Sequence, residues 1–338
     1  MTDSHPVVET VNLTKRYDDF TALDSLSIRV ESGQILGFIG PNGAGKTTTI
    51  RILVGLLKPT SGSARIAGAD CLTEARKIKR LVGYMPDDFG KYNNMRVSEY
   101  LDFFGAAYGI ERRARTRRID EVLEIAGATY MKDLFVDALS RGMQQRVAIA
   151  RTLIHDPKVI ILDEPANGLD PQARIDMRTM LRRLSEMGKT LIVTSHILPE
   201  LARVCDTVAM VTRGRLRAFG TLDEIMRDIQ QQRTFEIQLV DTDQISRVAT
   251  SVADWMKAAE QESTVDQIDA ETLVRFTTQL TDRELTPLLS HLVCGGEAVA
   301  QFREVPTDLE DAFLSVASES TDEASTGGES RVDDVVTS

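Results

Sequence analysis

One segment limits the possible folds more than any other part of this sequence. The apolar stretch Gln34–Ile39 is followed by a glycine-rich run that fits the pattern GxxxxGK[ST], Gly40-Pro41-Asn42-Gly43-Ala44-Gly45-Lys46-Thr47-Thr48. In such a loop the glycines let main-chain N–H groups surround phosphate, and the following helix adds its N-terminal dipole. Lys46 would reach the β- and γ-phosphates, and the Thr47 hydroxyl would bind Mg²⁺. The segment therefore predicts a strand, a phosphate-binding loop and a helix that together hold a nucleotide.

A second apolar strand ends in two acidic residues. Val159–Leu162 is followed directly by Asp163 and Glu164, and ligands of parallel sheets bind at the carboxyl edge of the strands. We expect Asp163 to hold Mg²⁺ mainly through its water shell, and Glu164 to polarise an attacking water as general base. The alternative is that these two acids only end the strand and have no role in metal binding or catalysis. The presence of the phosphate loop and of Pro165 after the pair weighs against it.

Short apolar segments alternate with helical patterns through the first two thirds of the chain. The segments are Val7–Leu13, Leu26–Val30, Ile35–Ile39, Val159–Leu162, Leu191–Thr194 and Val208–Val211. This alternation predicts an α/β fold with a largely parallel sheet covered on both faces. Helical periodicity at Val97–Tyr108, Ile119–Ala126 and Met143–Ile154 predicts a helical subdomain, at about residues 84–158, inserted in that sheet.

The length of 338 residues predicts two folded units rather than one. We place the first at residues 1–225 and the second, a small α/β domain, at 226–316, joined by the charged segment Leu222–Gln232. Strand patterns in the second unit lie at Phe235–Leu239, Leu273–Phe276 and Val299–Phe302, and helical patterns lie at Ile245–Trp255 and Arg283–Leu292. Residues 317–338 are rich in Ser, Thr, Gly and acids, which predicts a disordered acidic tail.

Four further features of the sequence occur in a fixed order around the phosphate loop. Tyr17 precedes the loop in LTKRYDDFTALD, Leu139–Arg146 reads LSRGMQQR, Ala166–Asp170 reads ANGLD, and His196 follows the strand Leu191–Thr194. Over about residues 7–220 this combination resembles the nucleotide-binding subunits of ABC transporters. The resemblance implies a P-loop NTPase fold of the ABC nucleotide-binding type, with ATP and Mg²⁺ as cofactors and ATP hydrolysis as the activity.

The resemblance also implies roles for these residues. Tyr17 would stack on adenine, His196 would sense the γ-phosphate, and Asp170 would border the nucleotide as part of the family's D-loop. Ser140 begins a helix, so its hydroxyl and the next N–H groups form an anion site. In the family, the segment containing Ser140 and Gly142 closes on the γ-phosphate held by a second subunit. We therefore expect a head-to-tail homodimer that encloses two Mg·ATP.

Two residues depart from the family's pattern. Arg141 replaces the usual first glycine of the signature segment, which excludes a left-handed backbone there and places a guanidinium near the partner's phosphate. Asp87, in Tyr84-Met85-Pro86-Asp87, stands where glutamine is common. Its carboxylate would contact Mg²⁺ or the attacking water, and its charge would alter the affinity for the metal.

Composition and charge limit the partners and the location of the chain. A net charge of −11 disfavours nucleic-acid binding, and no apolar run reaches the about 18 residues of a membrane span. The first ten residues do not have the pattern of a secretory signal, which predicts a cytoplasmic chain. The basic run Glu111–Arg118 is interpreted as a solvated helix face, with contact to anionic lipid or a partner as the alternative.

The family resemblance also implies a partner, a separately encoded membrane permease. The helical subdomain would contact this permease near Asp88–Met95. The chain would then lie on the inner face of the membrane. The segment Val305–Leu314 is similar to the closing element of bacterial exporter ATPases for drugs, lipids or polysaccharides, which favours export. Two alternatives remain: a soluble ATPase of the same fold acting on ribosomes or DNA, and a nucleotide-sensing module with little turnover. The absence of a second cassette disfavours the first, and Glu164 and His196 disfavour the second.

Overall fold

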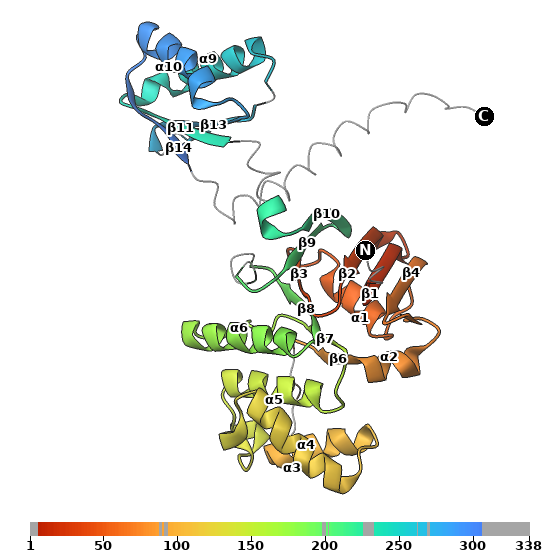
Figure 1. The fold of residues 1–338 in the computed structure, drawn as a ribbon. Coiled ribbons are helices and arrows are strands. Elements are labelled where there is room, and N and C mark those ends of the chain that lie inside the picture. The colour runs from red at the N-terminus through yellow and green to blue at the C-terminus, as the bar shows by residue number, and fades with distance from the viewer. Residues whose placement is uncertain are drawn as a thin grey trace, which may run out of the picture. The chain divides into compact units, whose positions relative to one another are not determined.

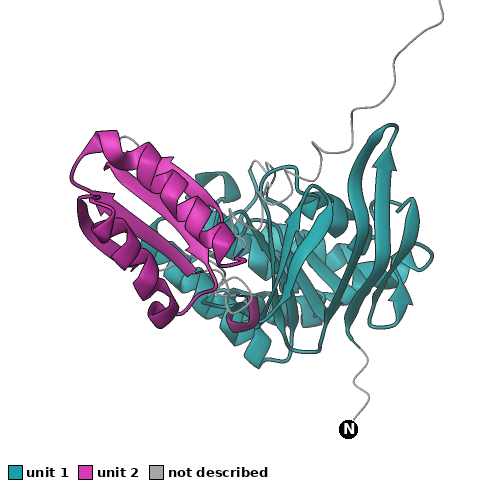
Figure 2. Ribbon diagram, turned by 90° about the horizontal axis from the view of Figure 1, so that it is seen from above, with its two compact units in different colours: residues 1–222 teal, residues 223–338 magenta. Residues whose placement is uncertain are grey.

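The computed structural model of the chain describes residues 6–87, 90, 94–197, 201, 203–225, 233–261, 263–268 and 271–305. The chain divides into two compact units, residues 1–222 and 223–338 (Figure 2). None of the helices in the described ranges is both long enough and apolar enough to cross a bilayer. The expected linker beyond residue 225, most of the Asp88–Met95 and Val305–Leu314 segments, and the tail 317–338 lie outside the described residues.

The first unit is built on a six-stranded sheet with the order β10-β9-β3-β8-β7-β6 (Figure 1). The strands are β3 (Ile35–Ile39), β6 (Val82–Met85), β7 (Val159–Leu162), β8 (Thr190–Ser195), β9 (Thr207–Thr212) and β10 (Arg215–Gly220). All neighbours are parallel except β10, which pairs antiparallel with β9. Every residue of β3 and β7 is buried, as the continuous apolar runs predicted. The parallel sheet is confirmed, and it brings the carboxyl ends of β3, β7 and β8 to one edge.

The first two predicted strands belong to a different sheet, so their assignment to the parallel sheet was wrong. β1 (Val8–Tyr17) and β2 (Phe20–Val30) form an antiparallel hairpin in which Tyr17 pairs with Phe20 across a two-residue turn. A chain that reverses over two residues can only pair antiparallel. β4 (Ser61–Ile66) and β5 (Ala69–Asp70) complete this four-stranded sheet.

Helices join and extend the two sheets of the first unit. α1 (Lys46–Leu53) contributes Ile50, Ile52 and Leu53 to one core that also contains residues of both sheets. α2 (Ala75–Leu81) leads into β6, and α6 (Pro171–Glu186) packs against β8. The three predicted helices of the insertion are confirmed as α3 (Val97–Ala107), α4 (Arg112–Ile125) and α5 (Arg141–Leu153), which contact one another.

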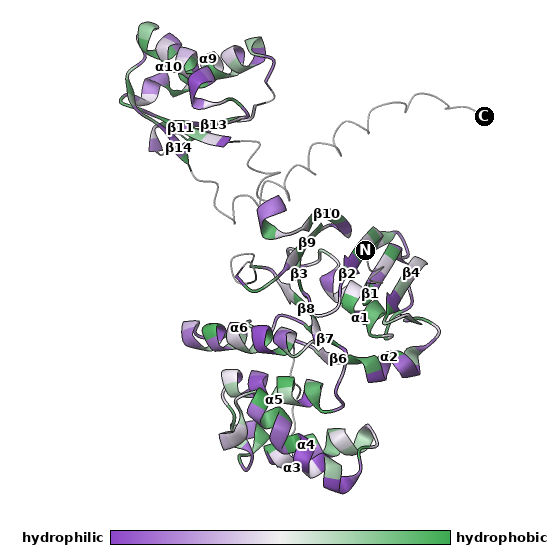
Figure 3. Cartoon of the chain, in the orientation of Figure 1, coloured by the Kyte–Doolittle hydropathy of each residue, from purple (hydrophilic) through white to green (hydrophobic). Residues whose placement is uncertain are grey.

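The second unit is an antiparallel sheet with two helices. Its elements in chain order are β11 (Arg233–Leu239), α9 (Ile245–Ala258), β12 (Val265–Ile268), β13 (Leu273–Thr278), α10 (Asp282–Cys294) and β14 (Val299–Val305). The sheet order is β12-β13-β11-β14, a split βαβ arrangement. Hydrophobic and hydrophilic residues alternate along α9 and α10 (Figure 3), because one side of each helix packs on the sheet. The predicted strands and helices are confirmed, and β12 is an addition.

One buried glutamate in the second unit forms ion pairs with two arginines. The side chain of Glu236, only 6% exposed, accepts hydrogen bonds from Arg275 (2.7 Å) and Arg303 (2.7 Å) on the two neighbouring strands. Burial by itself raises the pKa of Glu236, but the bonds from Arg275 and Arg303 outweigh it, so the pKa lies below its usual 4.5. The stabilisation from a lowered carboxyl pKa is therefore present above pH 4.5 and is lost as the pH falls through the folded-state value.

We expect Glu236→Gln to lower the free energy of unfolding of this unit by about 1–3 kcal/mol at pH 7, because two guanidinium groups then face each other without a carboxylate. The chain has a single tryptophan, Trp255 in α9, so its fluorescence during urea unfolding reports this unit selectively. The exposed Glu271→Gln is the matched control. Equal urea midpoints for Glu236→Gln and wild type at pH 7 would contradict the expected effect.

Candidate functional site

The predicted phosphate loop connects β3 to α1 in a conformation that requires glycine. Gly45 caps α1 with φ +106°, and a Cβ built there would lie 2.7 Å from Leu23 Cδ2 and 2.8 Å from the Ala22 carbonyl oxygen. Gly43 has φ +81° with open space around it. Both torsions lie where side-chain-bearing residues are strained. The loop therefore turns its main chain around the N-terminus of α1, the geometry that binds anions.

Lys46 is buried, which is an uncommon position for a lysine. Its Nζ donates to the carbonyl oxygens of Gly40 (2.5 Å) and Pro41 (3.4 Å) and lies 3.5 Å from Oε1 of Glu164. These contacts keep the amine inside the loop, at the end of β3. The arrangement brings the cation of the phosphate loop to the carboxylate that follows β7.

Thr194 of β8 holds the two acids after β7. Its Oγ1 donates to Oδ1 of Asp163 (2.7 Å) and accepts from the main-chain N–H of Glu164 (2.9 Å). Burial raises the pKa of Asp163, the bond from Thr194 lowers it, and the charges of Glu164 and Asp87 raise it further, with a net rise. The charges that raise the pKa of Asp163 are ones that a bound cation would offset.

His196 contacts the same glutamate from the end of β8. Its Nδ1 lies 2.9 Å from Oε2 of Glu164, so the two oxygens of this carboxylate face Lys46 and His196 respectively. Glu164 itself has φ +51°, an uncommon value for a residue other than glycine. The glutamate is thus held on both sides at the edge of the sheet.

These groups border one cavity of about 350 Å³. Nearly the whole phosphate loop and the three acids line this cavity. The lining residues are Tyr17, Phe20, Ala22, Pro41, Asn42, Gly43, Ala44, Gly45, Lys46, Thr47, Thr48, Asp87, Asp163 and Glu164. An aromatic end at the β1–β2 hairpin and a polar end at the acids match a nucleotide, which has a flat base and a charged phosphate chain. The structure therefore brings Tyr17 and Asp87 to the phosphate loop, although they lie far apart in the sequence.

The remaining predicted residues lie outside this cavity. Ser140 caps α5, where its side chain accepts from Met143 N–H (3.5 Å), and Asp170 caps α6 by accepting from Ala173 N–H (2.8 Å). A Cβ on Gly142 would meet only ordinary contacts at 3.8 Å. Among the described residues, the surroundings of Gly142 therefore leave room for a side chain.

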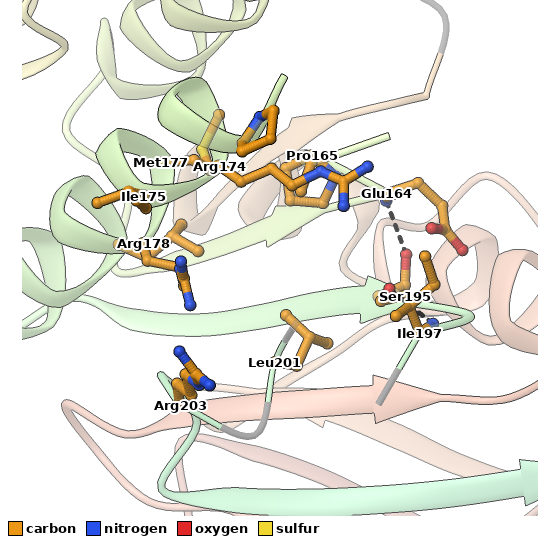
Figure 4. Close-up of a pocket in the computed structure, with 14 residues that line it drawn as sticks. Glu164, Pro165, Arg174, Ile175, Met177, Arg178, Ser195, Ile197, Leu201 and Arg203 are labelled. Carbon is orange, nitrogen blue, oxygen red and sulfur yellow. Dashed lines mark hydrogen bonds between the residues drawn. The ribbon is translucent and has the colours of Figure 1, made fainter. Parts of the chain in front are cut away.

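A second hollow of about 330 Å³ lies beside Glu164, between α6 and the end of β8 (Figure 4). Its walls include Met177, Leu181 and Leu201, and Arg178 and Arg203 turn toward one another across it. It contains no part of the phosphate loop. The hollow therefore lacks the anion-binding main chain that borders the cavity of the phosphate loop.

Comparison with known proteins agrees with the nucleotide-binding geometry of the first unit. Residues 23–167 match the ABC transporter family. The chain is 33% identical over 311 residues to a Nod factor export ATP-binding protein I of Ralstonia nicotianae, with 92% of this chain and 94% of the relative covered. The chain belongs to the ABC transporter ATP-binding proteins. Its first unit is accordingly an ATP-binding cassette, to which the antiparallel second unit is added.

Two further similarities extend this assignment. A probable multidrug ABC transporter ATP-binding protein of Escherichia coli, YbhF, is 38% identical over 246 residues, and the match spans only 42% of that relative's length and 71% of this chain. A solved ABC cassette, described as a dimeric post-hydrolysis state bound to ADP and Pi, matches with a TM-score of 0.58 and 28% identity. It covers 64% of this chain and 98% of its own.

Three contacting residues of this ABC cassette were not predicted. Phe20 lines the cavity together with Tyr17, and the two-residue turn between these aromatics was the available signal. Thr194 ends the predicted strand before His196 and Asn167 lies in the D-loop segment, but the sequence predicted no contact for either of them. Asn167 Nδ2 donates to Asp87 Oδ1 (3.4 Å), a pairing that depends on how distant loops meet.

Proposed function

We propose that the chain is the ATP-hydrolysing subunit of an exporter, that it works as a head-to-tail pair, and that it drives a separate membrane permease. One observation carries the proposal: Lys46 of the phosphate loop and Glu164 lie 3.5 Å apart in one cavity. A cation that binds phosphate and a base that activates water must be neighbours for hydrolysis of a phosphoanhydride.

The cavity assigns a role to each group around bound ATP. Tyr17 and Phe20 contact the base, the phosphate loop surrounds the phosphates, and Lys46 exchanges its carbonyl partners for the β- and γ-oxygens. Glu164 polarises the attacking water, and His196 fixes its second oxygen and contacts the γ-phosphate. The distances from Glu164 to Lys46 and to His196 support the roles of these three residues.

Mg²⁺ fits the acidic end of this cavity. The exposed Thr47 hydroxyl and the carboxylates of Asp87 and Asp163 are oxygen ligands of the type this ion prefers. When bound, the metal neutralises the charge that develops on the phosphates. We expect EDTA to abolish ATP hydrolysis and excess Mg²⁺ to restore it, measured by phosphate release. Full turnover in EDTA would contradict this assignment.

The head-to-tail pair accounts for the residues left outside the cavity. The N-terminus of α5 at Ser140 would offer N–H groups to an anion held by a second subunit. Gly142, which has room for a side chain within the subunit, would be needed where a partner approaches closely. The solved cassette that is described as dimeric supports a pair of subunits.

A membrane partner is supported by exposed apolar side chains on the helical insertion. Phe103, Leu134 and Phe135 are 55%, 41% and 45% exposed, and Phe135 forms an isolated bridge with Arg96, next to the Asp88–Met95 segment. Relatives described as serving Nod factor export and multidrug transport favour export as the direction. The chain would then lie at the cytoplasmic face of the membrane through its permease.

Affinity purification of the tagged chain from solubilised membranes tests the transport role. We expect an integral membrane protein with several apolar helices in stoichiometric amount, and loss of that protein when Phe135 is changed to Asp. Leu72→Asp, at an exposed position of the first unit outside the insertion, is the control that should retain it. Recovery of ribosomes alone would contradict the transport role and favour the soluble ATPase.

A further inference from the structure

The hollow between α6 and the end of β8 is separate from the nucleotide cavity, although Glu164 borders both. It has a volume of about 330 Å³, and much of its wall is apolar, with Pro165, Met177, Leu181 and Leu201 among its residues. Ligand pockets span about 300–1,000 Å³ and combine apolar walls with a few polar groups. The hollow is at the lower end of that range, so its size and its walls suit a small, largely apolar ligand.

Two cationic side chains meet across this hollow. Arg178 on α6 and Arg203, between β8 and β9, turn toward one another (Figure 4). Within the described ranges, neither guanidinium forms a hydrogen bond or an ion pair with another side chain. Two like charges that face one another are unfavourable, whereas an anion between them is attracted to both. The two arginines therefore favour an anionic group in the hollow.

The carboxylate nearest to these arginines is already engaged elsewhere. Glu164 is the only acid among the described residues that line the hollow. Its Oε1 lies 3.5 Å from Lys46 Nζ, and its Oε2 lies 2.9 Å from His196 Nδ1. Both oxygens are thus turned to the groups of the nucleotide cavity. The positive charge across the hollow is left for a ligand to neutralise.

The sequence of α6 explains why one arginine of the helix lacks a partner. Arg174, Arg178 and Arg182 follow one another at intervals of four residues, which places them along one side of the helix. Arg174 Nε donates to the Leu169 carbonyl oxygen (3.1 Å), and Arg182 donates to the carbonyl oxygen of Arg203. The bond from Arg182 also holds the main chain of Arg203 beside α6. The second guanidinium is therefore kept close to Arg178.

We propose that this hollow binds a small amphipathic anion, whose apolar body packs against Met177, Leu181 and Leu201 and whose carboxylate lies between Arg178 and Arg203. A carboxylate suits the two arginines because its oxygens match the planar N–H fork of a guanidinium. The ligand binds without forming or breaking a covalent bond. The site lies within one subunit, so it does not require the head-to-tail pair.

A ligand in this hollow would lie against the support of the hydrolytic glutamate. Glu164 and Thr194 contribute to the wall, and Thr194 Oγ1 accepts from the Glu164 N–H (2.9 Å). Ile197, directly after His196, belongs to the wall as well. Segments that must move during turnover are slowed when a ligand packs against them. Because the phosphate loop does not line the hollow, we expect an occupant to lower kcat and to leave the affinity for ATP unchanged.

Calorimetric titration of decanoate into the full chain tests the site. Arg178→Met removes one charge and keeps a long side chain. Ile175→Glu places an acid at an exposed position of the rim, three residues before Arg178, where it should pair with the arginine and compete with the ligand. We expect each variant to raise the dissociation constant of decanoate about tenfold or more. Arg183→Met, an exposed position of α6 outside the hollow, is the matched control and should bind decanoate as wild type does.

Decanol and decylamine are the matched probes that lack the negative charge, and both should bind about tenfold or more weakly than decanoate. Decanoate should also lower the kcat of phosphate release in wild type, and not in Arg178→Met at the same concentration. If decanoate does not bind, or binds equally to wild type, Arg178→Met and Ile175→Glu, the hollow is not its site. Binding that follows the expected order but leaves kcat unchanged would contradict the link to Glu164.

Discussion

Lys46→Met is expected to abolish detectable ATP hydrolysis, with a loss of at least about 10²- to 10³-fold. The Lys46 ammonium is the buried cation of the cavity, 3.5 Å from Glu164 and held at the mouth of the phosphate loop by the carbonyl oxygens of Gly40 and Pro41. Methionine fills a similar volume and offers no charge to the β- and γ-phosphates. Phosphate release at saturating Mg·ATP measures the loss.

The control for this experiment is Lys58→Met, because Lys58 is an exposed lysine with no part in the cavity. It should hydrolyse ATP at the wild-type rate. Affinity for a fluorescent ATP analogue should fall in Lys46→Met and stay unchanged in Lys58→Met. Wild-type turnover by Lys46→Met would show that hydrolysis does not pass through this loop.

Glu164→Gln is expected to lower kcat by about 10²- to 10⁴-fold while ATP still binds. Glutamine keeps the size of the side chain and can still contact His196, but it cannot accept a proton from the attacking water. The main-chain bond from Glu164 to Thr194 is unaffected by the change. The loss should therefore appear in kcat and not in the affinity for ATP.

Glu186→Gln, at the exposed end of α6, is the matched control for this second variant. Stopped-flow binding of the ATP analogue and steady-state phosphate release separate the two steps. A Glu164→Gln protein that fails to bind nucleotide would mean that Glu164 supports the cavity and does not act as base. A variant with unchanged kcat would place the base elsewhere.

The parallel sheet could be predicted because its strands are apolar throughout, whereas the N-terminal sheet could not. β3 and β7 are buried on both faces, so their sequences read as continuous hydrophobic runs. β1 alternates and pairs with β4, whose residues Ser61–Ile66 include Ser, Gly and Arg and give little strand signal. Pairing partners that lack a local pattern are visible only once the chain is folded.

The residues of the candidate site also differ in whether a local sequence pattern predicts them. Lys46 and Asp163 each lie in a contiguous motif, and the structure brings their segments to one edge as the alternation of strands and helices predicted. Thr194 could not be found in this way. It reaches Asp163 and Glu164 because β7 and β8 pair in a register that sets Leu162 beside Val193. A hydrogen bond that depends on strand register leaves no mark in either strand's sequence.

The mass of the Glu164→Gln protein in Mg·ATP, measured by light scattering during size-exclusion chromatography, tests the central claim most directly. ATP that is bound but not hydrolysed should hold two subunits together, so the account predicts twice the subunit mass with Mg·ATP and the single mass with Mg·ADP. A protein that binds ATP yet keeps the single mass at saturating Mg·ATP would contradict the paired mechanism.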